Sequence, residues 1–180
     1  EKEATKAFEP PKLPKMQIYQ NGSDAFRAIW HEFDNATRSI FMETYILKPD
    51  VVEEDYWQTR SGGQAWREVS IRFPKGLPSS VILIFDAFGS FPLSANDEFF
   101  KELIDNGGHV VCFNDFKSFW RWKVPKLRNH RKNIIVDGVV GFCGGMNTSG
   151  EYCKQDIGGT GRFRDTHMRV VGPVVSELHK

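Results

Sequence analysis

Two short apolar runs joined by Asp137-Gly138 constrain the fold of this chain more than any other stretch. The runs are Asn133–Val136 and Val139–Cys143. A type I′ turn requires positive φ at both of its central residues, and Asp-Gly is among the pairs that adopt it most readily. The pattern therefore predicts a β-hairpin, in which Asp137 acts as a turn former and ion-pair partner rather than as a catalyst.

Polar residues stand at the open end of this hairpin. His130 and Lys132 are two residues apart at the entry to the first strand, so an extended backbone places them on one face. The second strand ends in Gly144 and Gly145, small residues that let the backbone approach a ligand, and the corner returns the Asn147 amide to the same end. An imidazole, an ammonium and an amide suit a phosphate, because they supply a nucleophile or proton shuttle, a charge and hydrogen-bond donors. The alternative is a surface hairpin with a basic end.

The other periodic stretches predict an α/β fold. A helix is expected from Ser23 or Asp24, as the N-terminal cap, to about Ala36, and another from Asn96 or Asp97. A last, short helix is expected after Pro173. Strands are expected at Met16–Gln20, Ser39–Leu47, Val81–Asp86, His109–Phe113 and Thr166–Val171.

The hairpin residues also match a family signature. The pattern His-x-Lys, four residues, Asp, six residues, Gly-Gly-x-Asn is complete, and it resembles the HKD signature of the phospholipase D superfamily. Stretches beginning at Met42, Phe85 and Arg164 resemble the cardiolipin synthase branch, and the resemblance spans roughly residues 16 to 180. It implies a mixed central sheet with helices on both faces, as the N-terminal half of such an enzyme. A single domain is expected over residues 16–180, after an extended lead-in over residues 1–15.

The resemblance implies a role for each polar residue. His130 is expected to attack phosphorus and form a phosphohistidine, while Lys132 and Asn147 hold the phosphoryl oxygens. A carboxylate should bond the other ring nitrogen of His130, with Asp165 as the first choice and Glu43, which the resemblance places at the active-site end, as the alternative. No metal or cofactor is implied, because the carboxylates are not clustered.

A segment just before His130 interleaves aromatic and basic residues. From Lys117 to Lys132 there are seven basic residues and no acid. Tryptophan rings prefer the headgroup level of a bilayer and cations attract anionic lipid, so Trp122 and Arg128 are candidate substrate-binding residues of an interfacial lip. Two alternatives remain: a solvated face, or a surface that binds single-stranded nucleic acid.

Length and composition limit the setting. The chain has 180 residues, which suffices for one domain with a hydrophobic core. Its net charge of +1 gives no overall electrostatic attraction to polyanions. No run approaches the roughly 20 apolar residues that a membrane span needs. The chain begins with Glu, so we expect a piece of a longer protein whose anchor lies upstream. Association with the cytoplasmic side of a bacterial inner membrane, or with an equivalent organelle membrane, is expected from the resemblance.

The chain holds a single signature, although the chemistry needs a second imidazole to protonate the leaving alcohol. Either a second half downstream or a two-fold dimer must supply it, so the chain alone is expected to have little or no activity. The favoured function is transfer of a phosphatidyl group from a phosphatidylglycerol-like lipid to a lipid alcohol. The alternatives are a dimeric phosphodiesterase acting on nucleic acid and a phospholipase D-type hydrolase. Gly145, where many superfamily members carry serine, favours the lipid branch.

Overall fold

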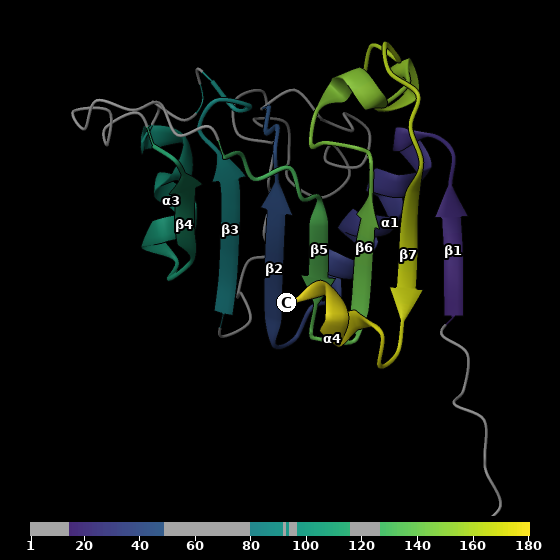
Figure 1. The fold of residues 1–180 in the computed structure, drawn as a ribbon, viewed down its shortest axis with the longest axis horizontal. Coiled ribbons are helices and arrows are strands. Elements are labelled where there is room, and N and C mark those ends of the chain that lie inside the picture. The colour runs from purple at the N-terminus through teal and green to yellow at the C-terminus, as the bar shows by residue number, and fades with distance from the viewer. Residues whose placement is uncertain (1–14, 49–79, 92, 94–96, 116–126) are drawn as a thin grey trace, which may run out of the picture.

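The computed structural model describes residues 15–48, 80–91, 93, 97–115 and 127–180. These residues build one seven-stranded sheet in the order β1-β7-β6-β5-β2-β3-β4 (Figure 1). Strands β2, β3 and β4 pair in parallel, and the remaining neighbours pair antiparallel, so the predicted mixed sheet is confirmed. The strands are β1 Lys15–Tyr19, β2 Ser39–Thr44, β3 Ser80–Asp86, β4 His109–Phe113, β5 Asn133–Val136, β6 Val140–Gly144 and β7 His167–Val171.

Helices cover both faces of this sheet, as predicted. Helix α1 packs on one face, while α4 packs against a separate cluster on the opposite face (Figure 1). The helical elements are α1 Gly22–Asp34, η2 Asp97–Phe100, α3 Lys101–Asp105, η4 Gly150–Tyr152, η5 Gln155–Ile157 and α4 Val175–Leu178. Within the described ranges, no helix is long and apolar enough to cross a bilayer.

The N-terminal cap of α1 differs from the prediction. Asn21 is the cap, and its side-chain oxygen accepts a hydrogen bond from the backbone N–H of Asp24 at 3.0 Å. Ser23 is buried and instead donates to Asp156 at 2.7 Å, across the fold. The sequence offered adjacent capping residues, and this long-range contact decided which one begins the helix.

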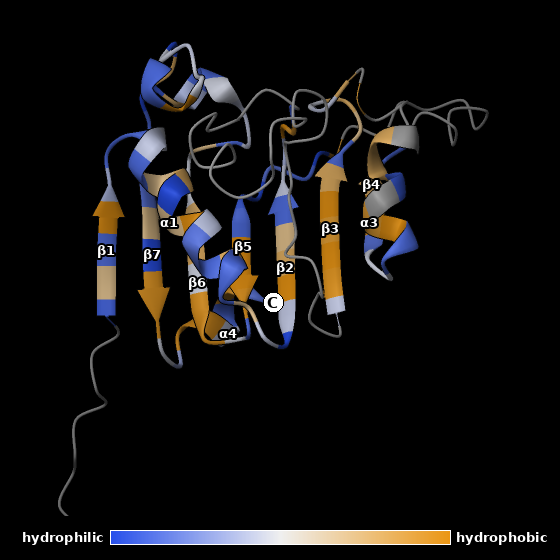
Figure 2. Cartoon of the chain, turned by 180° about the vertical axis from the view of Figure 1, so that it is seen from behind, coloured by the Kyte–Doolittle hydropathy of each residue, from blue (hydrophilic) through white to orange (hydrophobic). Residues whose placement is uncertain are grey.

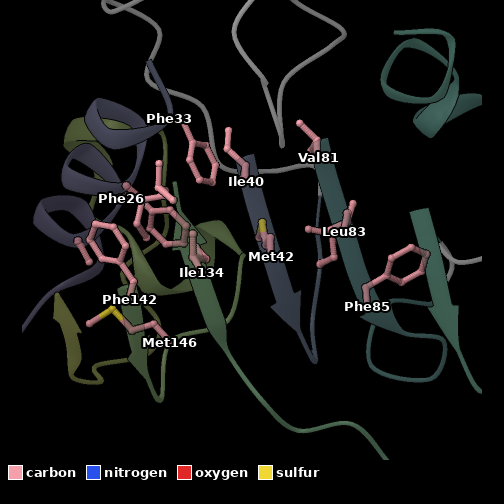
Figure 3. Packing of buried hydrophobic residues seen from close by; sticks show 14 of the residues in the cluster. Phe26, Phe33, Ile40, Met42, Val81, Leu83, Phe85, Ile134, Phe142 and Met146 are labelled. Atoms are coloured by element: carbon pink, nitrogen blue, oxygen red, sulfur yellow. The ribbon is translucent and has the colours of Figure 1, made fainter. Parts of the chain in front are cut away.

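The core lies between α1 and the sheet. Apolar residues at helical spacing on α1 meet alternate residues of the central strands (Figure 3). Full burial of one such side chain is worth about 1.5–3 kcal/mol, so this layer dominates the stability of the fold. Figure 2 shows that β3, inside the sheet, is mostly hydrophobic, whereas the edge strand β1 carries hydrophilic residues as well. The core side chains labelled in the close view are Phe26, Phe33, Ile40, Met42, Val81, Leu83, Phe85, Ile134, Phe142 and Met146.

The β5–β6 hairpin has the predicted turn. Asp137 and Gly138 have φ of 54° and 71°, as a type I′ turn requires. The Asp137 carboxylate accepts hydrogen bonds from the backbone N–H groups of Thr37, Arg38 and Ser39 at 2.9, 2.7 and 2.9 Å. The Arg38 guanidinium bonds the backbone carbonyl of Asp137 rather than its carboxylate. Asp137 therefore ties the hairpin to the connection between α1 and β2.

One edge of the sheet gathers the predicted site. The carboxyl ends of β2, β3, β4 and β6 and the amino ends of β5 and β7 lie together at the upper edge in Figure 1. Most of the expected lead-in, residues 1–14, and Trp122 lie outside the described residues.

Replacing Asp137 by Asn should make stability less sensitive to acid. Burial raises the pKa of Asp137, but hydrogen bonds from the backbone N–H groups of Ser39, Thr37 and Arg38 outweigh it and lower the pKa from 3.8 to about 2. The stabilisation is therefore complete above the unfolded pKa near 3.8 and is lost as the pH falls through about 2.

Urea unfolding of wild type and Asp137→Asn should differ by about 1–2 kcal/mol at pH 7, since hydrogen bonds to a charged group are lost. The difference should shrink steadily below about pH 4. Asp105→Asn, which removes an exposed partner of Lys101, is the matched control and should change little. A difference that stays constant down to pH 2 would contradict this role of Asp137.

Candidate active site

His130 and Lys132 meet at the upper edge of the sheet, as predicted. The Lys132 side-chain nitrogen Nζ lies 3.1 Å from His130 Nδ1 and 2.9 Å from the His130 carbonyl oxygen. His130 is exposed, whereas Lys132 is only 7% exposed. The Tyr45 ring lies beside both, with its centroid 4.5 Å from the His130 ring and 5.7 Å from Lys132 Nζ. The His130 imidazole is therefore exposed to solvent, next to the buried Lys132 ammonium.

The charge of Lys132 has little compensation nearby. Burial lowers the pKa of Lys132, and the negative charge of Asp165 partly offsets that effect by raising it. The hydrogen-bond acceptors of Nζ among the described residues are both on His130, and both are neutral. A buried cation with neutral partners favours the arrival of an anion such as a phosphate.

Asn147 is buried at the same edge of the sheet and holds the backbone next to Tyr45 in place. Its side-chain oxygen accepts a hydrogen bond from the backbone N–H of Ile46 at 3.1 Å, and Nδ2 donates to the Tyr152 hydroxyl at 2.8 Å. Because Ile46 follows Tyr45, Asn147 holds the segment that presents the Tyr45 ring to His130. An amide nitrogen has two donors, so one remains for a ligand after the bond to Tyr152.

The two glycines make room for the start of β7. A Cβ atom at Gly144 would lie 2.9 Å from Nδ1 of His167, and a Cβ atom at Gly145 would lie 2.1 Å from Oδ1 of Asp165. Both distances are far below ordinary contact. The Gly-Gly pair is therefore complementary in shape to Asp165 and His167, which come from the stretch beginning at Arg164.

The two candidate carboxylates take different positions. Asp165 accepts a hydrogen bond from the Thr166 backbone N–H at 2.7 Å and raises the pKa of Lys132 by its charge. Glu43 is buried and accepts from Asn129 Nδ2 at 2.6 Å. Among the described residues, neither carboxylate forms a hydrogen bond with His130. The choice of Asp165 as the partner of His130 stays a prediction.

The chain has sequence relatives among the cardiolipin synthases. The chain is 33% identical over 164 residues to the cardiolipin synthase of Geobacillus sp. strain WCH70 and 34% identical over 166 residues to the major cardiolipin synthase ClsA of Bacillus subtilis strain 168. This chain belongs to the phospholipase D superfamily and to its cardiolipin synthase-like branch. Each match covers 91% of the chain, but the chain spans only 30% and 31% of the two relatives' lengths.

Solved structures agree on the superfamily fold. The crystal structure of Nuc, a phospholipase D family member from Salmonella typhimurium, matches with a TM-score of 0.55 and 15% sequence identity, covering 93% of this chain and 90% of that chain. No family model matches the chain. The seven-stranded mixed sheet is thus the fold of this phospholipase D-like chain.

One buried residue near His130 was not assigned a role in the site from the sequence. Asp86 is fully buried and accepts hydrogen bonds from the backbone N–H groups of Phe88, Gly89 and Asn129 at 2.9, 3.1 and 3.2 Å. It therefore ties the end of β3 to the residue before His130. The available signals were an apolar run that ends in aspartate and the resemblance of the stretch beginning at Phe85.

Arg128, a predicted substrate-binding residue, lies close to Asp86 and Phe88. Its guanidinium is 5.0 Å from the centroid of the Phe88 ring and 3.9 Å from Oδ1 of Asp86. Nη1 is buried and has no hydrogen-bond partner among the described residues. Across the same residues, no group of three or more metal-ligating side chains is present.

A double-mutant cycle should show that Gly145 and Asp165 are coupled. Gly145→Ala alone should cost about 1–3 kcal/mol of stability, because the new Cβ overlaps the Asp165 carboxylate. In an Asp165→Ala background the same change should cost less, with a coupling energy of at least about 0.5 kcal/mol.

The matched control is Gly159→Ala, whose Cβ would overlap Cys153 rather than Asp165. Its effect should add to that of Asp165→Ala. Urea unfolding of the variants measures both cycles. Equal costs of Gly145→Ala in the two backgrounds would show that the glycine does not make room for Asp165.

Proposed function

We propose that this chain carries one half-site of a phosphatidyltransferase of the cardiolipin synthase type. The enzyme transfers a phosphatidyl group from a phosphatidylglycerol-like lipid to a lipid alcohol. The observation that carries the proposal is the 3.1 Å contact between the Lys132 ammonium and an exposed His130, in a chain related to cardiolipin synthases.

The first step forms a bond between a ring nitrogen of His130 and phosphorus and breaks the bond from phosphorus to the leaving glycerol oxygen. Before substrate arrives, the Lys132 ammonium donates to Nδ1, so the proton of the neutral ring sits on Nε2. A bound phosphate competes for the ammonium and releases Nδ1. The ring proton then moves from Nε2 to Nδ1 by exchange with solvent, Nδ1–H donates a hydrogen bond to the Asp165 carboxylate, and the lone pair of Nε2 is free to attack phosphorus.

Lys132 and Asn147 stabilise the charge that develops on the phosphoryl oxygens. An imidazolium on the second half donates its proton to the leaving oxygen. In the second step the acceptor alcohol bonds phosphorus as the bond to His130 breaks, and the second imidazole takes the alcohol proton. Both steps use only side chains of the protein and the two lipid substrates. A second HKD half in the same native chain, or a second copy of this chain, supplies that imidazole.

An exposed apolar turn next to the site suits a lipid surface. Phe88 and Phe91 of this turn are 60% and 65% exposed, and Phe88 lies against the Arg128 guanidinium. Leu127, the residue before Arg128, is 79% exposed. Apolar rings beside a cation match the boundary between acyl chains and anionic headgroups. We place the protein at a membrane surface, with this turn toward the lipid and Arg128 as a headgroup ligand. The predicted interfacial role of Trp122, which lies outside the described residues, stays a prediction.

A dimeric phosphodiesterase acting on nucleic acid is the second candidate. One observation favours it: this chain covers 90% of the solved Nuc chain, so one copy of this length makes a whole domain of the fold. In that case two copies of His130 would face each other across a two-fold axis, and the phospholipid would be replaced by a nucleic acid.

His130→Ala should abolish transfer in the natural protein that contains these residues. Loss of the nucleophile is expected to reduce turnover of labelled phosphatidylglycerol by roughly 10⁴-fold. The isolated chain should give little or no product, since it holds one imidazole of the required pair. The matched control is His109→Ala, which changes an exposed histidine on β4.

Labelled single-stranded DNA, offered in parallel, separates the two candidates. Product from phosphatidylglycerol alone supports the lipid transferase. Product from DNA alone would reverse the ranking, and turnover by the monomeric isolated chain would remove the need for a second half.

The exposed turn can be tested without turnover. Phe88→Ser with Phe91→Ser should weaken binding of the chain to phosphatidylglycerol vesicles by about tenfold, because both apolar side chains leave the lipid. The matched control is Met16→Ser with Ile18→Ser, which removes two similarly exposed apolar side chains from β1, the edge strand at the end of the sheet away from β3. Equal effects of the two pairs in vesicle sedimentation would refute a specific lipid-facing turn.

A further inference from the structure

Lys132, Gly144 and His167 form one row across the sheet. Asn133 pairs with Cys143 and Gly144 pairs with His167, so continuing the β5–β6 register by one residue puts Lys132 opposite Gly144. Residues directly opposite one another in antiparallel strands share a face. Since Gly144 has no side chain, the His167 ring lies over it, with Nδ1 2.9 Å from where a Cβ would be. Only a glycine therefore separates the ammonium from the imidazole.

His167 is buried without a hydrogen-bond partner. His167 is only 3% exposed, and neither of its ring nitrogens, Nδ1 and Nε2, has a hydrogen-bond partner among the described residues. A buried imidazole nitrogen without a partner is destabilising, and native structures nearly always satisfy such groups with protein or with ordered water.

The ring borders a small cavity that also reaches Lys132. Its polar lining also includes Glu43, Thr44 and Thr148, and part of its apolar wall comes from the buried side of α1. The cavity measures about 10 Å³, close to the space that one water molecule requires. A water there needs two to four polar partners, and the lining residues can supply them.

We infer that this cavity is a single-water site, and that His167 is a positioning residue that holds the Lys132 ammonium through that water. Lysine has three N–H donors, and two of those of Lys132 go to His130 Nδ1 and the His130 carbonyl oxygen. The third donates to the water, and the water donates to a ring nitrogen of His167. The water site stands on its own, whereas the benefit of a fixed ammonium rests on the proposed function.

The imidazole is neutral in this arrangement. Burial lowers the pKa of His167, the charge of Asp165 raises it and that of Lys132 lowers it, so that the pKa is about 4. A neutral ring has one nitrogen that accepts a hydrogen bond, which a water beside an ammonium can donate to. The ring adds no positive charge beside Lys132, so it steadies the ammonium without repelling it.

A crystal structure of the chain that shows ordered water tests the site directly. We expect one water within hydrogen-bond distance of a His167 ring nitrogen and of Lys132 Nζ. A cavity without water, or a His167 ring bonded directly to another protein group, would overturn the inference.

The pKa of Lys132, followed by NMR of its Cε methylene, tests the positioning role. His167→Leu removes the acceptor beyond the water, so the charged form loses support and the Lys132 pKa should fall by about one unit. His167→Gln keeps a polar partner and should move it much less. His109→Leu changes an exposed histidine and should leave it unchanged.

Equal pKa values for Lys132 in wild type and His167→Leu would overturn the positioning role. If His167→Leu does not fold, His167→Gln together with the water in the wild-type crystal decides the question. Neither measurement uses turnover, so a failure of this inference is distinct from a failure of the proposed transferase activity.

Discussion

The pairing of β5 with both β2 and β6 is the constraint on which the rest of the structure depends. β5 joins the parallel part of the sheet to the antiparallel part, and the chain enters it directly from His130 and Lys132. The Asp137 turn ties the far end of the same hairpin to the residues before β2. A register slip of one residue would turn Lys132 to the other face of the sheet and dismantle the site.

Polar groups that the fold buries are concentrated at one edge of the sheet. Lys132, Asp86 and Glu43 are all buried there, and the two carboxylates accept hydrogen bonds that position the chain just before His130. Burial of charge is costly unless it is compensated, so such an edge costs stability. Proteins tolerate that cost where chemistry requires it, and the relatives of this chain place it in the phospholipase D superfamily.

Local patterns predicted much of the fold because they act over short distances. The Asp-Gly turn and the bounds of β4 are confirmed, since turn geometry and apolar periodicity need no distant partner. The cap of α1 was predicted wrongly because Asp156, far along the chain, binds Ser23. The partners of His130 illustrate the same limit: Tyr45 lies beside the ring through a tertiary contact that no spacing revealed.

The sequence alone determined the hairpin and the adjacency of His130 and Lys132, because each rests on residues close together in the chain. It also indicated the phospholipase D superfamily, because a family signature is read from the linear order of residues. Only the tertiary structure decided that Asp86 supports the approach to His130 and that the Gly-Gly corner receives Asp165 and His167. Those relations join strands that are distant in sequence. They depend on which residues lie opposite one another across the sheet, and strand register is a property of the assembled fold.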